Sequence, residues 1–142
     1  MKSIFLTTAG LSAALFLAAA AGCGSGRLSG EYYAEARVAA GKEESRERGY
    51  SLTEMKAKLQ ASPQSIKLLP GGRYTWNTGS GVNEGSWRVE GETIVFRDDI
   101  SRGIRIQPLL QTDRQWRLGP GGEIINDATF SRYNIEIVYR RR

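Results

Sequence analysis

The pattern that decides the fold is clearest in the stretch GSWRVEGETIVFR, residues 85–97. Two runs that carry β-branched and aromatic residues, 85–89 and 93–97, flank Glu90-Gly91-Glu92, and a glycine between two such runs is typical of a tight hairpin connection. Toward the N-terminus, Pro70-Gly71-Gly72 is a turn signal between two similar runs. The sequence therefore predicts a chain of antiparallel β-hairpins.

Short apolar runs punctuated by glycine continue through the C-terminal half. The segment Gly119-Pro120-Gly121-Gly122 is a second strong turn signal. Residues 78–84 are expected to form a longer flexible loop, and Asp98-Asp99 to lie at a hairpin turn. The strands predicted from residue 65 onward are 65–69, 73–77, 85–89, 93–97, 103–106, 115–118, 123–125 and 133–139, with Phe130 in a further short segment.

A helix is predicted for residues 51–62. Ser51 and Glu54 have the spacing of a capping box, in which each side chain meets the other residue's backbone N–H. The apolar residues Leu52, Met55 and Leu59 recur at helical spacing. A helix of this length is too short to be stable alone, so its apolar stripe is expected to pack on the sheet. Contact with a membrane or a partner is the alternative.

The segments before this helix complete the fold prediction. Residues 30–38 alternate between apolar and polar side chains, as a half-buried strand does, and the charged residues 41–49 are predicted to form a solvated loop. The total of about eight to ten short strands without βαβ spacing indicates a mainly β protein. We expect a small antiparallel meander barrel, with a sandwich as the alternative, because closure removes the exposed edges of a sheet.

The first 22 residues have the organisation of an export signal. Residues 1–3 supply one positive charge, residues 4–21 are apolar, and Ala20-Ala21-Gly22 are small enough for a peptidase cleft. The segment Ala20-Ala21-Gly22-Cys23 resembles the lipobox of bacterial lipoproteins. That resemblance implies cleavage between Gly22 and Cys23 and attachment of fatty acids, such as palmitate, through the Cys23 thiol. An ordinary secretory signal, leaving a free thiol, is the alternative.

The resemblance to lipoproteins sets the expected domains and location. We expect a signal peptide at 1–22, a lipidated cysteine with a short flexible tether at 23–27, and a folded domain at 28–142. The expected location is the outer membrane, on its periplasmic face or surface, in a host with two membranes. In other hosts it is the outer face of the cell membrane.

The charge balance suits a protein close to anionic lipid or cell-wall polymers. The chain has 20 Lys and Arg against 15 Asp and Glu, but these charges are scattered, which argues against nucleic acid as a partner. The one basic run, Arg140-Arg141-Arg142, is interpreted as a tail near anionic lipid or glycan. A frayed terminus without function is the alternative.

The spacing of turns and aromatic residues supports a second resemblance. It is carried by Gly30-x-Tyr32, by residues 68–74, by Gly85-x-Trp87 and by residues 90–94. Together they are similar to small lipocalin-like, calycin-type domains of bacterial lipoproteins. The resemblance spans residues 28–97 best and implies a β-barrel. The helical insertion at about 51–62 departs from an up-and-down barrel.

The sequence excludes several kinds of catalysis. It contains no His, which removes the commonest general base and metal ligand. An acylated Cys23 can be neither a nucleophile nor a thiolate ligand. The residues after Asp98-Asp99 lack the regularly spaced oxygen ligands of a calcium loop, and residues 78–85 lack the lysine of a phosphate loop. We therefore expect no catalytic residues, no metal and no cofactor.

Six aromatic residues fall on the faces that are expected to point inward. In a barrel of about eight strands they either fill the core or line a pocket for one small apolar ligand, with rim arginines meeting an acidic head group. They are Tyr32, Tyr74, Trp76, Trp87, Phe96 and Trp116.

Three functions remain open at this point. The first is a non-catalytic, membrane-anchored binding domain for a small apolar ligand, an envelope component or a protein partner. The second is an envelope inhibitor or stress protein that acts on a hydrolase. The third is a hydrolase with a carboxylate site, for which no particular pair of carboxylates is singled out.

Overall fold

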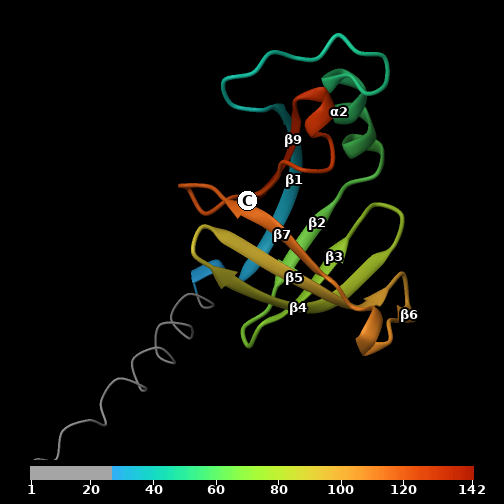
Figure 1. Cartoon of the computed structure of the whole chain (residues 1–142), viewed down its shortest axis with the longest axis vertical. Helices are drawn as coiled ribbons and strands as arrows, with labels where there is room; N and C mark the ends of the chain where they lie inside the picture. Colours follow the sequence, from blue (N-terminus) through green and yellow to red (C-terminus); the bar gives the residue numbers. More distant parts are fainter. Residues whose placement is uncertain (1–26) are drawn as a thin grey trace, which may run out of the picture.

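The computed structural model describes residues 27–142, and Figure 1 shows their arrangement. The predicted signal peptide, Cys23 and the tether up to residue 26 lie outside the described residues. The elements are β1 (Gly30–Val38), α2 (Leu52–Ala61), β2 (Ser65–Leu68), β3 (Arg73–Asn77), β4 (Val82–Glu90), β5 (Thr93–Ser101), β6 (Ile104–Arg105), η1 (Pro108–Leu110), β7 (Asp113–Leu118), β8 (Ile124–Asn126), η2 (Ser131–Tyr133) and β9 (Ile135–Arg141).

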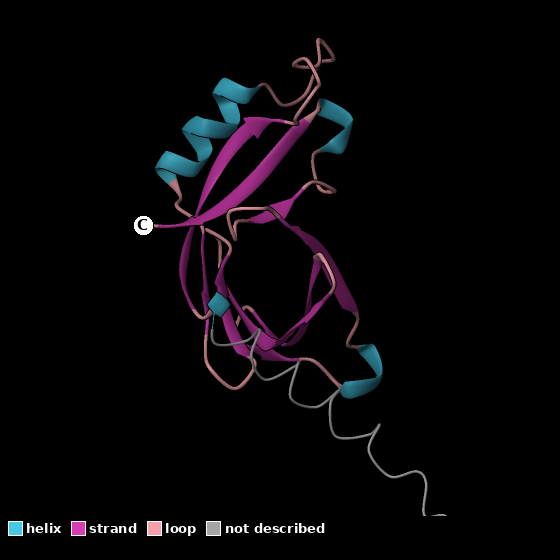
Figure 2. Cartoon of the chain, turned by 90° about the vertical axis from the view of Figure 1, so that its left-hand side faces the viewer, coloured by secondary structure: helices cyan, strands magenta, loops and turns pink. Residues whose placement is uncertain are grey.

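The strands form one antiparallel sheet that closes on itself. Their order is β4-β3-β2-β1-β9-β8-β7-β5-β6, and the additional pairing of β4 with β5 closes the first eight into a barrel. Figure 2 shows this barrel as a ring. The short strand β6 pairs only with the end of β5, outside the closure. The predicted mainly β fold is confirmed, and of the two alternatives the structure shows the barrel.

Strands β1 and β9 extend beyond the barrel and carry the helix. They pair from Tyr32 opposite Arg141 to Val38 opposite Ile135, and α2 packs beside this extension (Figure 2). Met55 is buried at 5% exposure, and the rest of the apolar stripe packs partly buried against the core. The predicted packing of the helix on the sheet is therefore confirmed. We call this part of the molecule the α2 lobe.

The start of α2 has the predicted capping box. The Ser51 Oγ accepts a hydrogen bond from the Glu54 backbone N–H at 3.1 Å. In return, the Glu54 carboxylate accepts from the Ser51 backbone N–H at 3.2 Å. Two N–H groups that the helix itself leaves unpaired are thus satisfied.

The inward faces of the strands meet in one hydrophobic cluster. Alternation along each strand sends every second side chain into the barrel, which makes the core continuous from the barrel into the α2 lobe. The buried members are Tyr32, Ala36, Met55, Ile66, Leu68, Tyr74, Trp87, Ile94, Phe96, Trp116, Ile124, Ile135, Ile137 and Tyr139.

A buried carboxylate joins three strands on the outer face. Glu136, on β9, is 4% exposed and accepts hydrogen bonds from Arg37 Nε at 3.0 Å and Arg117 Nη2 at 3.2 Å. Arg117 also binds Asp127 at 3.2 Å. Because both arginines reach over the sheet from β1 and β7, this network ties the neighbouring strands of the barrel together.

Two sequence predictions are wrong in the region of β4 and β5. Asp98 and Asp99 lie within β5, and the chain reverses instead at Arg102 and Gly103, which both have positive φ, 50° and 80°. The predicted loop at 78–84 is also shorter, because β4 begins at Val82. Aspartates are depleted in strands, and Asp98 is stabilised there by inward-facing partners described below.

No helix within residues 27–142 is long and apolar enough to span a bilayer.

Candidate ligand site at the barrel end and the barrel interior

Four of the six predicted aromatic residues meet in the middle of the barrel. Tyr74 and Phe96 have ring centroids 4.8 Å apart, and Phe96 and Trp116 are 5.3 Å apart, both in edge-to-face contact. Trp76 meets Trp116 at 5.2 Å. Tyr139, which the sequence interpretation did not include, stacks on Trp116 at 5.4 Å. We call these five residues the aromatic belt.

The aromatic belt crosses the barrel. Its members come from β3, β5, β7 and β9, and Trp76 Nε1 on β3 donates to the Tyr139 hydroxyl on β9 at 3.2 Å. The rings thus contact one another across the interior in the geometries that aromatic pairs prefer. These contacts favour the interpretation that the four predicted residues fill the core over the interpretation that they line a pocket.

Burial keeps the hydroxyl of Tyr139 protonated. Loss of water around the ring raises the pKa of Tyr139 well above its usual value, because the charged form is poorly solvated there. The neutral hydroxyl therefore has a proton to donate, and it donates to Gln64 Oε1 at 2.9 Å. Gln64 precedes β2, so this bond links the belt to the barrel rim.

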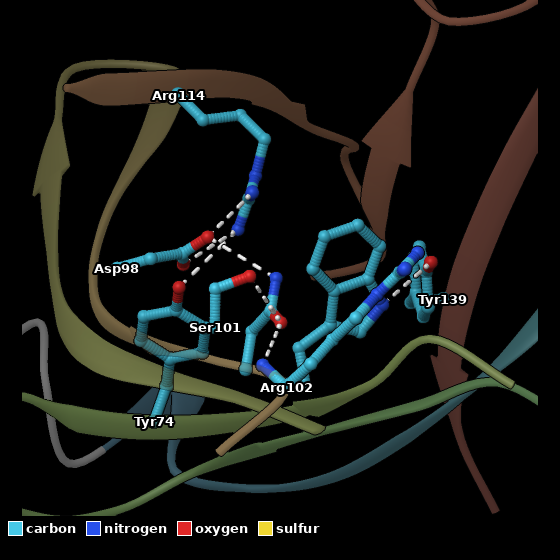
Figure 3. Close-up of polar contacts among 8 residues, drawn as sticks. Tyr74, Asp98, Ser101, Arg102, Arg114 and Tyr139 are labelled. Atoms are coloured by element: carbon cyan, nitrogen blue, oxygen red, sulfur yellow. Dashed lines mark hydrogen bonds and ion pairs between the residues drawn. The ribbon is translucent and has the colours of Figure 1, made fainter. Parts of the chain in front are cut away.

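An ion pair inside the barrel lies against one side of the belt (Figure 3). Arg114, on β7, points inward and binds both oxygens of Asp98 at 3.1 Å. Its Nη2 also donates to the Tyr74 hydroxyl at 3.2 Å, and its guanidinium lies 4.4 Å from the centre of the Trp76 ring. We call Asp98, Arg114 and Asn83, which donates to Asp98 at 3.2 Å, the polar layer.

The polar layer is tied to the nearby β5–β6 turn. The Asn83 Oδ1 accepts from the Ser101 hydroxyl and from the Arg102 backbone N–H, both at 3.3 Å. Apart from the buried Arg114 Nε, which has no hydrogen-bond partner among the described residues, the side-chain donors and acceptors of the layer bind one another or their neighbours. The Asp98 and Arg114 side chains are only 16% and 29% exposed. This arrangement places polar side chains inside the barrel beside the β5–β6 turn and pairs the charge of Arg114 with that of Asp98.

Sequence interpretation missed the polar layer because Asp98 was expected at a hairpin turn and Arg114 lies just outside the predicted strand 115–118. The signal was nevertheless present in the alternation. Asp98 lies two positions after the core residue Phe96, and Arg114 lies two positions before Trp116. The neighbouring Asp99 points to the other face and binds Arg73 there at 2.6 and 3.0 Å. The hydrogen bonds from Arg73 lower the pKa of Asp99.

Substitutions of the two residues of the ion pair in the polar layer, Arg114 and Asp98, should have strongly coupled effects on the free energy of unfolding. We expect Arg114→Met to lower the free energy of unfolding by about 1–3 kcal/mol, because Asp98 then loses its counter-ion in a largely buried place. The double variant Arg114→Met/Asp98→Leu should cost less than the sum of the single variants by at least about 1 kcal/mol. Urea unfolding measured by circular dichroism gives these values.

The exposed ion pair between Arg73 and Asp99 provides the control for this comparison of single and double variants. Its side chains are 49% and 29% exposed, so Arg73→Met should cost only about 0–1 kcal/mol. Additive effects of the two substitutions in the polar layer would show that Arg114 and Asp98 do not stabilise each other.

The remaining two predicted aromatic residues, Tyr32 and Trp87, lie apart from the belt. Trp87 Nε1 donates to the Leu69 backbone oxygen at 3.3 Å, beneath the β2–β3 turn. The Tyr32 hydroxyl donates to the Leu28 backbone oxygen at 2.6 Å and accepts from Arg141 Nε at 3.1 Å. The structure therefore divides the predicted pocket residues between the belt and the region where the chain enters the barrel.

A groove of about 770 Å³ lies at this entry region, and Tyr32 forms part of its wall. Its volume is in the range of small-molecule sites. Four separate parts of the chain build it: the residues before β1 together with the start of β1, the end of β4, the β7–β8 turn and the end of β9. We call it the entry groove, and its lining residues are Arg27, Leu28, Tyr32, Val89, Pro120, Gly121, Gly122, Glu123, Arg140 and Arg141.

The charge of the entry groove is predominantly positive. Three arginines and one glutamate line it. Arg141 is engaged with the protein, because its Nη2 donates to the backbone oxygens of Arg27 and Ser29, and its guanidinium lies 5.2 Å from the centre of the Tyr32 ring. Within residues 27–142, the side chains of Arg27 and Arg140 form no hydrogen bond or ion pair. They are available to an anionic ligand.

Arg140 and Arg141 line the entry groove, and the C-terminal basic run is not a frayed tail. Arg140 and Arg141 lie within β9, paired with β1 through Tyr33 and Tyr32. Arg142 follows the strand, with its guanidinium 4.4 Å from the centre of the Tyr33 ring. The basic run is thus held in a defined place at the barrel end.

The chemistry of the entry groove is that of binding. Leu28, Tyr32 and Val89 give it an apolar wall, while the free guanidinium groups can bind a phosphate or carboxylate. Glu123 is its only carboxylate, so the lining cannot supply the carboxylate pair that glycoside hydrolysis uses. Among residues 27–142, no group of three or more His, Cys, Asp or Glu side chains is placed to hold a metal ion.

Comparison of the chain with protein-family models, curated proteins and solved structures finds no match. The barrel, the entry groove and the predicted export signal are the features that bear on function.

Proposed function

We propose that the chain is a lipid-anchored protein of the cell envelope whose barrel is a non-catalytic binding domain. Its ligand is an envelope component with an anionic head and an apolar body, bound in the entry groove. The observation that carries the proposal is the combination, in one groove, of two unengaged arginines with an apolar wall. The aromatic belt occupies the interior, so the ligand lies at the barrel end.

The predicted lipid anchor places this groove near a membrane. Cys23 precedes Arg27 by four positions, and a fully extended residue spans at most about 3.6 Å, so Arg27 lies within about 14 Å of the lipidated residue. Two or three acyl chains at Cys23 would hold the protein stably on a bilayer. An amphiphile that leaves or enters the membrane surface would meet the entry groove directly.

The positive charge of the entry groove favours this proposal over the alternative that the protein inhibits a hydrolase. Lysozymes are basic, and the arginines of the entry groove would repel such a partner. A small anionic amphiphile matches both the volume and the charge of the groove.

The binding test uses a domain that begins at Gly24, which contains every strand and the whole buried core of the described structure. We expect octyl phosphate to bind this domain and octyl glucoside, which lacks the charge, to bind at least about tenfold more weakly. A charge-assisted hydrogen bond contributes about 1.5–3 kcal/mol, so Arg27→Gln/Arg140→Gln should weaken octyl phosphate binding by at least about tenfold. Isothermal titration calorimetry measures these affinities.

The matched control removes two charges elsewhere. The double variant Arg46→Gln/Arg48→Gln changes two arginines in the exposed loop before α2. It lowers the net charge by the same amount as Arg27→Gln/Arg140→Gln. This variant should bind octyl phosphate like the unchanged domain. Equal binding by both double variants, or equal binding of octyl phosphate and octyl glucoside, would overturn the assignment of the entry groove.

A further inference from the structure

The loop between β5 and β7 displays the most exposed large apolar side chains in residues 27–142. Ile104 is 72% exposed, Leu109 97% and Leu110 69%. Single exposed leucines are common on protein surfaces, but three such residues in one short segment form a patch. We call residues 104–110 the apolar loop.

The backbone of the apolar loop is held in place, so the three side chains are presented on a fixed scaffold. The Ile106 N–H donates to the Asp99 oxygen at 2.8 Å, which joins the loop to β5. The Gln111 side chain donates to the Ile106 oxygen at 3.0 Å, and η1 adds a bond from the Leu110 N–H to the Gln107 oxygen at 2.9 Å. Pro108 restricts the start of η1.

The charged side chains within residues 100–112 are all arginines. The carboxylates that border this segment, Asp99 and Asp113, are bound to arginines of the barrel. Arg102 and Arg105 flank its apolar residues, and residues 100–112 contain no Asp or Glu. Protein segments that lie at the interface of anionic membranes typically combine exposed apolar side chains, such as leucine and isoleucine, with basic side chains such as arginine. A surface of anionic lipid supplies both an apolar layer for the side chains and phosphates for the guanidinium groups.

The place of the apolar loop in the fold fits a membrane contact. η1 lies on the side of the barrel that faces away from the α2 lobe, as Figures 1 and 2 both show. The chain enters β1 at another point of the barrel, near the entry groove (Figure 1). A barrel held at the bilayer by its N-terminus can therefore touch the same bilayer with the apolar loop while the α2 lobe points away from it.

We propose that the apolar loop inserts Leu109, Leu110 and Ile104 into the boundary between head groups and acyl chains of an anionic bilayer. It forms a second attachment point that orients the barrel on the membrane. The inference rests on the lipid anchor of the proposed function, and the experiment below separates the failure of one from the failure of the other.

The experiment uses the mature, membrane-extracted protein in vesicles of phosphatidylcholine and phosphatidylglycerol. Cys23 is the only cysteine of the sequence, so in the lipidated protein Leu109→Cys introduces the only free thiol. A fluorophore on this thiol should lose at least half of its emission when the vesicles contain lipids with a nitroxide on the acyl chain. Glu43→Cys, in the exposed loop before α2, is the control and should lose almost none.

The outcomes distinguish the possible occupants of the loop. Protein that floats with the vesicles while the Leu109→Cys probe stays unquenched overturns the insertion of the loop and leaves the anchor intact. A probe that is shielded from a water-soluble quencher but not reached by the lipid nitroxide shows that protein, such as a second copy, covers the loop, and also overturns the proposal. Protein that fails to float and is labelled at Cys23 overturns both proposals.

Discussion

Gly85→Ala is expected to prevent stable closure of the barrel, with a loss of about 3 kcal/mol or more in the free energy of unfolding. The register between β4 and β5 shifts at Glu84 and Gly85, and there the two backbones come very close. A Cβ atom on Gly85 would lie 2.8 Å from the Arg97 carbonyl carbon and 2.9 Å from the Asp98 Cα, and closer still to the Arg97 carbonyl oxygen. Backbone atoms in the middle of a strand cannot move away without breaking the pairing that closes the barrel.

The effect of Gly85→Ala must be separated from the general effect of replacing a glycine. Gly91, at the β4–β5 turn, has a φ of 61°, and no described atom would lie within 4 Å of a Cβ there. Gly91→Ala should therefore cost only the backbone strain, about 1–2 kcal/mol. Urea unfolding followed by circular dichroism compares the two variants. A Gly85→Ala domain as stable as the Gly91→Ala domain would contradict the close approach of the strands.

Trp116→Ala is expected to cost about 3–5 kcal/mol, because it removes the residue on which the aromatic belt converges. Trp116 is 3% exposed and contacts the rings of Trp76, Phe96 and Tyr139. The substitution would open a cavity in the centre of the barrel that rigid strands cannot close. Near-ultraviolet circular dichroism should also lose the signal of the packed aromatic rings.

The control for Trp116→Ala lies on the same strand. Gln115 is exposed on the outer face of β7, and Gln115→Ala should change the free energy of unfolding by less than about 0.5 kcal/mol. The decisive comparison is between these two variants in urea. A Trp116→Ala domain that loses less than about 1 kcal/mol would mean that the belt does not fill the barrel.

The elements that sequence interpretation predicted well are those specified by local chemistry. The hairpin at residues 85–97 follows from its alternation and its central glycine, and the capping box of Ser51 and Glu54 marks the start of α2 within one residue. Strand pairing between neighbours in the sequence follows in the same way. The return of β9 to pair with β1 was not specified by any local signal, and closure was expected from the general cost of exposed sheet edges.

The parts that were missed depend on contacts between distant residues. Asp98 suggests a turn when it is considered alone, and only Arg114, which is brought beside it by the pairing of β5 and β7, explains an aspartate inside the barrel. The entry groove likewise combines residues near positions 27, 89, 121 and 140, which no spacing in the sequence relates. The aromatic residues were placed inward correctly, but their division between the belt and the entry region depends on position along the barrel axis.

The proposed function joins these features into one arrangement. The aromatic belt and the polar layer make the barrel a rigid support, the entry groove is the proposed site for an anionic amphiphile, and the apolar loop is the proposed second contact with the bilayer. The proposed roles of the entry groove and the apolar loop both depend on a membrane within reach of the domain. Attachment through Cys23 is therefore the central claim.

The most direct test of this claim is the intact mass of the protein extracted from membranes of the cells that make it, together with the mass of its N-terminal peptide. We predict a chain that begins at Cys23 and carries a diacylglyceryl group on the cysteine sulfur. A chain that retains residues 1–22, or one that carries an unmodified thiol at Cys23, would contradict the account.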